Sequence, residues 1–271
     1  MRQITPIVKN LIIINALMLL AAYVIGDRFH ISLDNLLGLH YYKSQYFKPY
    51  QFVTHMFMHG GIMHLFFNMY ALFLFGVALE SVWGSRKFFT FYIITGLGAA
   101  LINMLVNYFQ FSHLTNEINA FINSPSPLSF ELLIKKHFLG FFSTESEASV
   151  SSLVNAWTAD PNNTVYLVDA KNILSKMMTE LMDIPVVGAS GAIFGVLLGF
   201  GMLFPNTILM FIFPPIPIKA KYVVLIYGAI ELYFGLSQPG SEIAHFAHLG
   251  GMIFGFILIK LWGTNKYNSQ F

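Results

Sequence analysis

Long apolar stretches alternate with shorter polar ones along this chain. Six stretches are apolar enough to be membrane-spanning helices, because a span of hydrocarbon needs about 20 mostly apolar residues. They run from Val8 to Ile25, Ile62 to Trp83, Phe88 to Tyr108, Val186 to Phe204, Tyr222 to Leu236 and Ala244 to Trp262. The fifth is the shortest and weakest. The pattern predicts an all-α, polytopic membrane protein with six transmembrane helices.

Two polar segments interrupt the series. Asp27 to Phe52 alternates apolar, aromatic and polar residues, which is typical of a loop in the headgroup layer. Gln110 to Asp183 is a long insertion in which we expect ordered pieces at Phe130 to Phe142 and at Asp169 to Met182. The second piece is amphipathic, with Asp169 as a possible cap.

Within the insertion, the serine-rich segment Ser143 to Ser152 is typical of a flexible connection, and Thr158 to Asn163 of a turn. The expected organisation therefore has three parts. Residues 1–109 hold the first three core helices and the interfacial loop, residues 110–183 form an extracytoplasmic insertion, and residues 184–271 hold the last three helices.

The composition agrees with a membrane protein, because 56% of the 271 residues are hydrophobic and 10% are charged. The first span has a second interpretation as a cleavable signal peptide, which five further spans make less favourable. The chain has no cysteine, which excludes disulfides and thiolate metal sites. A net charge of +2 is too small to indicate nucleic-acid binding.

Basic residues predict the orientation, since they gather on the cytoplasmic side of short loops. With the N-terminus inside, the inner segments hold Arg2, Lys9, Arg86, Lys87, Lys219, Lys221, Lys260 and Lys266. The short outer loops then hold only Arg28, Lys43 and Lys48. We expect both termini to be cytoplasmic, in a membrane such as the bacterial inner membrane.

Ser190 is a polar residue in an apolar span, between Gly188 and Gly191. Serines in membrane helices ordinarily return their hydroxyl to the backbone, and small residues serve close helix packing. However, His248 in the last span is followed by Gly251 and Gly255 on the same helix face. Gly188, Gly191 and Gly195 form a similar stripe next to Ser190. Two such glycine faces bring helices close together, and a histidine near the serine is a base suited to activating its hydroxyl.

His64 and Asn68 lie one turn apart at the start of the second span, so both can point donors at one spot. Acyl transfer needs such donors where negative charge develops on the carbonyl oxygen. His55 and His59 lie nearby and, with His64, suggest an alternative metal site. Because no carboxylate or cysteine accompanies them, we expect no metal and no cofactor. We expect structural roles for His55 and His59, and a structural role or exposure to solvent for His245.

In combination these residues resemble the rhomboid family of intramembrane serine proteases. The resemblance rests on the box Gly188-Ala189-Ser190-Gly191, on Ala247-His248 with Gly251 and Gly255, and on the pair His64 and Asn68. Six spans in the same order extend it over most of the chain, but not over the insertion. A six-helix rhomboid-like bundle is therefore implied.

The resemblance implies that Ser190 is the nucleophile and His248 its base, without a required acidic third member. It also implies that His64, Asn68 and the backbone N–H of Ser190 hold the oxyanion. Phe194, one turn beyond the serine, matches an aromatic residue that packs on the catalytic ring.

Four further residues are compared with the family. Glu80 matches a glutamate that braces the first outer loop. In that loop the family often has Trp-Arg, where this chain has Tyr50-Gln51. Glu231 is an acid inside the fifth span, which in the family lies beside the route of substrate entry, and such a residue is a functional candidate. The alternative interpretation is that its side chain simply reaches a wet cavity or the outer interface.

These inferences predict an intramembrane serine endopeptidase whose cavity opens outward. Its expected partners are the lipid bilayer and single-span membrane proteins, whose helices must unwind near the outer face before cleavage. Two alternatives belong to another class: an inactive relative that binds membrane helices, and a small six-span transporter. Both alternatives require function to survive Ser190→Ala.

Overall fold

The computed structural model describes residues 3–138, 144–210, 216–237 and 244–263. The elements, in chain order, are α1 (Pro6–Phe29), α2 (Leu33–Leu37), α3 (Gln51–Thr54), η1 (His55–Phe57), α4 (Ile62–Ala71), η2 (Leu72–Gly76), α5 (Val77–Trp83), α6 (Ser85–Asn123), α7 (Pro127–His137), α8 (Thr144–Ala159), α9 (Thr164–Met182), α10 (Ser190–Leu203), β1 (Ile208–Met210), β2 (Pro217–Lys219), α11 (Ala220–Ser237) and α12 (His245–Trp262). The two strands form an antiparallel hairpin with Leu209 opposite Ile218.

Five helices are long and apolar enough to cross a membrane: α1, the continuous helix Ile62–Trp83, α6, α11 and α12. The second of these joins α4, η2 and α5, where η2 is a π-helical turn. The expected class, an all-α polytopic membrane protein, is confirmed. The sixth core helix, α10, is apolar but has only 14 residues, and most of them are buried among the other helices.

The fourth predicted span begins too early. Val186 is extended and pairs with Leu39 of the first loop, each backbone N–H donating to the other residue's carbonyl at 2.9 Å. Helix α10 therefore starts at Ser190, four residues after the expected boundary. The apolar run includes the β-branched residues Val186 and Val187, which suit an extended strand as well as a helix.

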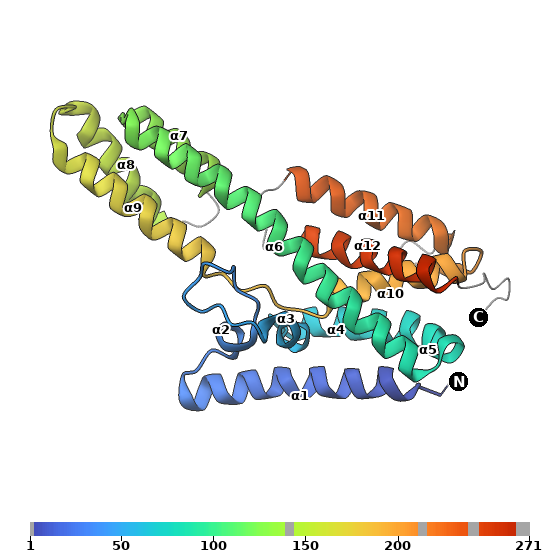
Figure 1. Ribbon diagram of the computed structural model, residues 1–271. Coiled ribbons are helices and arrows are strands. Elements are labelled where there is room, and N and C mark those ends of the chain that lie inside the picture. The colour runs from blue at the N-terminus through green and yellow to red at the C-terminus, as the bar shows by residue number, and fades with distance from the viewer. Residues whose placement is uncertain (1–2, 139–143, 211–215, 238–243, 264–271) are drawn as a thin grey trace.

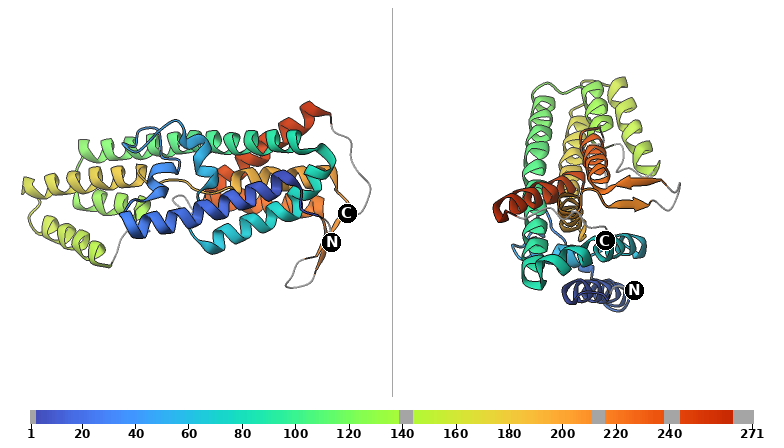
Figure 2. Two further views of the ribbon diagram at one scale, coloured as in Figure 1. Left: turned by 90° about the horizontal axis from the view of Figure 1, so that it is seen from below. Right: turned by 90° about the vertical axis from the view of Figure 1, so that its right-hand side faces the viewer.

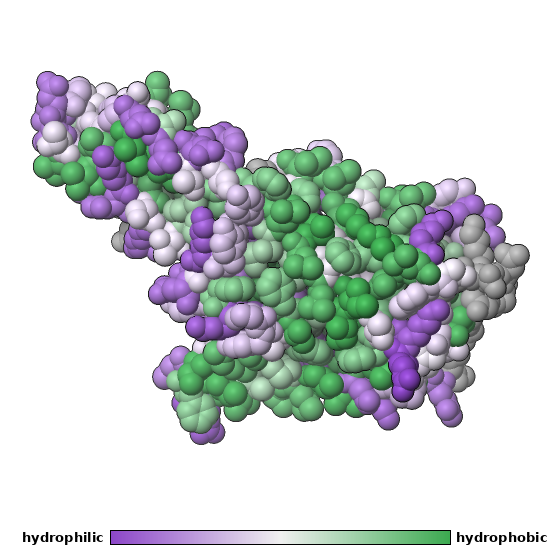
Figure 3. Space-filling view, viewed as in Figure 1, coloured by the Kyte–Doolittle hydropathy of each residue, from purple (hydrophilic) through white to green (hydrophobic). Residues whose placement is uncertain are grey.

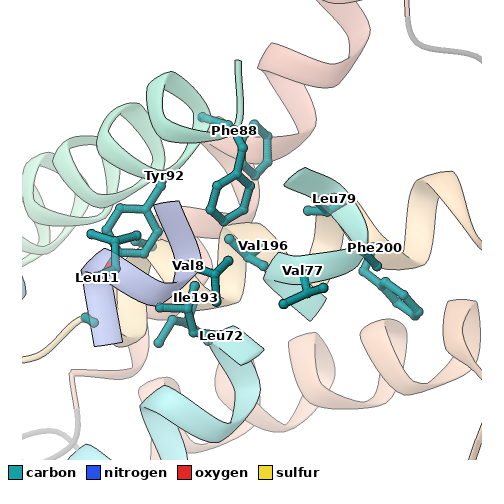
Figure 4. Packing of buried hydrophobic residues seen from close by; sticks show 14 of the residues in the cluster. Val8, Leu11, Leu72, Val77, Leu79, Phe88, Tyr92, Ile193, Val196 and Phe200 are labelled. Atoms are coloured by element: carbon teal, nitrogen blue, oxygen red, sulfur yellow. The ribbon is translucent and has the colours of Figure 1, made fainter. Parts of the chain in front are cut away.

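Buried side chains from several other helices surround α10, and Figure 4 shows part of this cluster. The labelled members are Val8 and Leu11 of α1, Leu72 of η2, Val77 and Leu79 of α5, Phe88 and Tyr92 of α6, and Ile193, Val196 and Phe200 of α10. Lipid is as apolar as these residues, so close packing rather than escape from water holds membrane helices together. The cluster fixes α10 in the middle of the bundle.

Helix α6 differs from the predicted third span because it continues to Asn123, well into the insertion. At 1.5 Å per residue its 39 residues extend for about 58 Å, roughly twice the hydrocarbon thickness of a bilayer. Figure 1 shows its distal half projecting from the bundle beside α7, α8 and α9. The two other directions of Figure 2 show the same arrangement.

The distal part of α6 and the three insertion helices share a second buried cluster. Its members include Phe121 of α6, Phe130 of α7, Trp157 of α8 and Leu174 of α9. The serine-rich segment is thus helical from Thr144, which corrects the expected flexible connection. Apolar residues on one side of α8, Trp157 among them, give this segment a face to bury, which outweighs the weak helix propensity of serine.

The other insertion predictions are partly right. The first expected piece, Phe130 to Phe142, corresponds to α7, and its last residues lie outside the described ones. The amphipathic helix α9 starts at Thr164, where Asn163 caps it by accepting from the N–H of Val165, so Asp169 is not its cap. The expected turn lies between α8 and α9.

The surface of the helical bundle differs in hydropathy from that of the insertion. In Figure 3 hydrophobic residues cover the helical bundle, while hydrophilic residues gather on the projecting insertion and at the opposite end. Many large apolar side chains of the bundle are exposed, for example Leu17, Phe67, Leu225 and Leu261. Exposed apolar residues on a continuous belt are what a lipid-facing surface requires.

Candidate active site

The chain enters α10 through a sharp turn that presents Ser190. Gly188 has a φ of +128°, a conformation that residues with a Cβ rarely adopt, and its N–H donates to the carbonyl of His55 at 2.9 Å. Ser190 is the first residue of α10 and remains partly exposed. The first N–H groups of a helix have no acceptor within it, so the backbone around Ser190 offers free donors.

Ser190 and His248 meet across the contact between α10 and α12. The Oγ of Ser190 lies 2.8 Å from the Nε2 of His248, which is buried. Glycines make this approach possible, because a Cβ on Gly251 would overlap the carbonyl oxygen of Gly191. One turn on, a Cβ on Gly255 would lie 3.3 Å from the Cα of Gly195.

The predicted glycine faces are therefore largely right. His248, Gly251 and Gly255 do share the side of α12 that faces α10. Gly188 is the exception, because it lies before α10 and shapes the turn instead of continuing the helical stripe.

The imidazole of His248 is held by a stacked aromatic ring. Phe194 lies one turn after Ser190, and its ring is 4.2 Å from that of His248 at an interplanar angle of 6°. This is the placement that the resemblance implied for Phe194. Stacking limits rotation of the imidazole and keeps Nε2 directed at the hydroxyl.

His64 of α4 lies close to Ser190, and Asn68 follows it one turn later on the same helix. The point that a Cβ of Gly188 would occupy is 2.9 Å from the Nε2 of His64 and 3.6 Å from the Oγ of Ser190. The N–H of Gly60 donates to the Nδ1 of His64 at 3.4 Å, which leaves Nε2 to carry the proton. Asn68 is buried, and its amide nitrogen has no hydrogen-bond acceptor among the described residues.

Glu231 of α11 is a member of this site that was not assigned to it from the sequence. Its Oε2 lies 2.9 Å from the Nδ1 of His248 and 2.6 Å from the Nδ1 of His245, and all three residues are buried. Among the described residues, these three form the one group of histidine and acidic side chains arranged to hold a metal ion. His55, His59 and His64 do not form such a group.

A sequence model of the Rhomboid domain matches residues 46–113 and 149–264, which is more than half of the chain. The chain belongs to the rhomboid family. The match leaves out residues 1–45 and 114–148, but it includes residues 149–183 of the insertion, to which the resemblance was not expected to extend.

Several rhomboid proteins are similar to this chain over a short region. Rhomboid protease AarA of Providencia stuartii is 40% identical over 58 residues, which is 21% of each chain. RHOMBOID-like protein 6, mitochondrial, of Arabidopsis thaliana is 34% identical over 58 residues, covering 21% of this chain and 19% of its own. Rhomboid-like protein 11, chloroplastic, of the same plant is 40% identical over 57 residues, covering 21% and 20%. The chain thus matches about a fifth of the length of these curated relatives.

In this rhomboid chain Glu80 does not brace the first outer loop, which corrects the role implied for it. Its two carboxylate oxygens accept from the backbone N–H groups of Ile7 and Val8 at 3.0 Å, and Ser85 donates to it at 2.6 Å. Glu80 thus caps the start of α1, where unpaired N–H groups and the helix dipole favour an anion. The first loop lies at the other end of α1.

The first loop is held instead by Gln51, at the departure from the Trp-Arg pair common in rhomboids. Its side chain is fully buried and donates to the carbonyls of Leu36 and Tyr46 at 3.3 and 2.9 Å. Its oxygen accepts from the N–H groups of His40 and Lys48 at 3.3 and 3.0 Å. A neutral amide with both donors and an acceptor can therefore tie four points of the loop together.

His55 and His59 have surroundings that suit structural roles. Burial lowers the pKa of each to about 4, so both are neutral near pH 7. His55 donates from Nδ1 to the carbonyl of Gln51 at 2.8 Å, and its own carbonyl receives the N–H of Gly188. His59 packs edge-on against His64, with ring centres 5.1 Å apart. Together they support the walls of the candidate site.

Proposed function

We propose that this rhomboid protein is an intramembrane serine endopeptidase that uses Ser190 and His248. The observation that carries the proposal is the 2.8 Å contact between Oγ and Nε2, within a bundle whose helices are apolar enough to lie in lipid. A serine hydroxyl is a poor nucleophile until a base takes its proton, and an imidazole nitrogen at this distance supplies that base.

In this proposal the Oγ of Ser190 attacks the scissile carbonyl while its proton passes to the Nε2 of His248. The resulting oxyanion accepts hydrogen bonds from the amide of Asn68, the Nε2–H of His64 and the backbone N–H of Ser190. His248 then protonates the departing amine, and later activates the water that hydrolyses the acyl-enzyme. The unpaired amide of buried Asn68 supports this role, because a buried donor without an acceptor is otherwise costly.

The proposed substrates are single-span membrane proteins that reach the site from the lipid. A hydrogen-bonded helix shields its carbonyls, so the substrate must be locally unwound before attack. The basic residues favour cytoplasmic termini, which sets Ser190 and His64 toward the outer side of a membrane such as the bacterial inner membrane. Partial exposure of Ser190 and His64 supports access of water and substrate.

The test is labelling of the purified, detergent-solubilised protein with a fluorophosphonate probe, together with cleavage of a model single-span substrate. Wild type should be labelled and should cleave, whereas Ser190→Ala and His248→Ala should do neither. Ser81→Ala is a matched control, because Ser81 only donates to the carbonyl of Val77 within its own helix. Cleavage that survives Ser190→Ala would overturn the proposal and favour the non-catalytic alternatives.

The oxyanion assignment has its own variant. Asn68→Ala should slow labelling by about 100-fold, because the loss of one such donor costs on the order of 3 kcal/mol in the transition state. Unchanged labelling of a folded Asn68→Ala protein would remove Asn68 from the proposed mechanism.

A further inference from the structure

Glu231 is an acidic residue buried within the helical bundle. It comes from α11, while His245 and His248, the residues that it contacts, come from α12. A carboxylate inside a membrane protein is expensive unless it is paired. Both partners here use the same ring atom, Nδ1, and both approach the same carboxylate oxygen, Oε2.

The packing of α11 on α12 fixes the position of this carboxylate. Gly228 and Gly235 lie three residues before and four residues after Glu231, so the three share one face of α11. A Cβ on Gly228 would lie 3.2 Å from Met252, and one on Gly235 would lie 3.2 Å from Phe246. Without side chains at these two positions, α12 comes close enough for the short Glu231 side chain to reach both imidazoles.

The contact with His248 has a direct chemical consequence. When a proton resides on Nδ1 beside the carboxylate, Nε2 presents its lone pair to the hydroxyl of Ser190. When Nε2 takes the proton of Ser190, the ring becomes a cation 2.9 Å from an anion. The Nδ1 does not make a linear hydrogen bond, so this contact acts mainly through charge and gains strength when the ring is protonated.

We propose that Glu231 is a positioning residue that extends the Ser190–His248 pair to a chain of three, with His245 holding its carboxylate in place. The inference rests on the proposed function, and it differs from the two-residue arrangement that the resemblance implied. Glu231 touches neither the substrate nor the reacting atoms. It acts through His248, by selecting the tautomer and by stabilising the imidazolium in the transition state.

The same three groups also suit a divalent metal ion, which gives a rival use of the site. The distances of 2.6 and 2.9 Å from one carboxylate oxygen to the two nitrogens are those of hydrogen-bonded or ion-paired groups. A metal on the Nδ1 of His248 would keep the proton on Nε2, where it could not accept the proton of Ser190. The geometry therefore favours the direct contact.

The experiment compares wild type, Glu231→Gln, Glu231→Asp and the control Leu232→Ala as full-length protein in detergent. Leu232 is the next residue on α11 and is exposed on its lipid side. The readouts are the rate constant of fluorophosphonate labelling, kcat and KM on a single-span substrate, and the melting temperature. We expect Glu231→Gln to lower the labelling rate and kcat by about 10-fold or more with little change in KM.

Rescue by the conservative variant separates positioning from a merely structural role. Glu231→Asp keeps the charge and should recover part of the lost rate, while Leu232→Ala should match wild type. Wild-type rates in a folded Glu231→Gln protein would overturn the inference. A loss of rate in Glu231→Gln that parallels a fall in melting temperature and is not restored in Glu231→Asp would also overturn it. The same holds for a wild-type activity that depends on zinc and is removed by a chelator. An inactive wild type would instead overturn the proposed function.

Discussion

Gly251→Ala tests whether the spacing of α10 and α12 sets the geometry of the candidate dyad. The new Cβ would overlap the carbonyl oxygen of Gly191 and lie 2.8 Å from its carbonyl carbon. Non-bonded carbon atoms rest at about 3.5–4.0 Å, so α12 must move away from α10 by roughly 1 Å. The cost cannot be absorbed by a rotamer change, because the atoms on both sides belong to helix backbone.

That displacement acts directly on the pair. Ser190 Oγ and His248 Nε2 are 2.8 Å apart, close to the most common length of a hydrogen bond made by a hydroxyl. A further separation of roughly 1 Å breaks the contact, and a misplacement of this size can cost about 100-fold in rate. We therefore expect Gly251→Ala to lower the rate of fluorophosphonate labelling by about 100-fold, with a loss of stability of about 1–3 kcal/mol.

Gly255→Ala is the matched control on the same helix face. There a Cβ would make contacts no closer than 3.3 Å, so a small adjustment of the helices accommodates it. Labelling rates are measured for both variants at a temperature at which both are folded, as judged by their melting curves. A folded Gly251→Ala protein labelled at the wild-type rate would refute the link between helix spacing and activation of Ser190.

Three other variants test parts of the structure around the site. Burial lowers the pKa of His59 to about 4 from an ordinary 6.5. The free energy of unfolding is therefore highest above pH 6.5, where the ring is neutral in both the folded and the unfolded state. It falls by ~3 kcal/mol as the pH is lowered toward 4, because the unfolded state then binds a proton that the folded state does not. The melting temperature of His59→Phe should accordingly decline less over this pH range than that of wild type; an equal decline would contradict the assignment. Gln51→Leu removes the side-chain partner of the N–H groups of His40 and Lys48 and of the carbonyl of Tyr46, while the carbonyl of Leu36 keeps the hydroxyl of Tyr50. It should lower the free energy of unfolding by at least ~2 kcal/mol. Limited trypsin digestion, read by cleavage at Lys43 and Lys48, should then proceed faster than in wild type. Glu80→Ala should destabilise the protein by ~1–2 kcal/mol through loss of the α1 cap, yet leave labelling unchanged, and slower labelling at equal folding would contradict this.

Residues that share a helix face were the most predictable part of the site. The spacing of His248, Gly251 and Gly255 is visible in the sequence, and α12 keeps that register in the structure. The same holds for His64 and Asn68 on α4. Fold class followed from the length of the apolar stretches, because hydrocarbon thickness leaves few alternatives for a chain of this composition.

Contacts between helices were less predictable. Glu231 was recognised as an unusual acid, but nothing in its own helix indicates that it faces His248, 17 residues later. Gly228 and Gly235 could have indicated this contact, since small residues on the helix face that carries an intramembrane acid indicate that another helix packs there. The role implied for Glu80 was wrong, and the sequence already contained evidence against it. Glu80 lies 16 residues after His64 on one continuous helix, so the two are about 24 Å apart and Glu80 cannot reach the first loop.

Irregular backbone was the least predictable feature. The extended segment before Ser190 has the composition of a span, and its pairing with Leu39 depends on a loop more than 140 residues earlier. Likewise, α8 has the composition of a linker and becomes helical because Val150 and Trp157 have a cluster to join. In both cases distant contacts outweigh local preference.

Helix α6 is continuous, so it connects the insertion rigidly to the residues beside Ser190. Its Ala99 lies against Gly191, next to Ser190, and its far end at Asn123 belongs to the packed insertion. These two points are about 36 Å apart along a stiff rod. A pivot of about 2° at the distal end swings Ala99 by roughly 1 Å, the scale on which the rate of an enzyme responds. A force that tilts the projecting helices would therefore displace the residues beside Ser190.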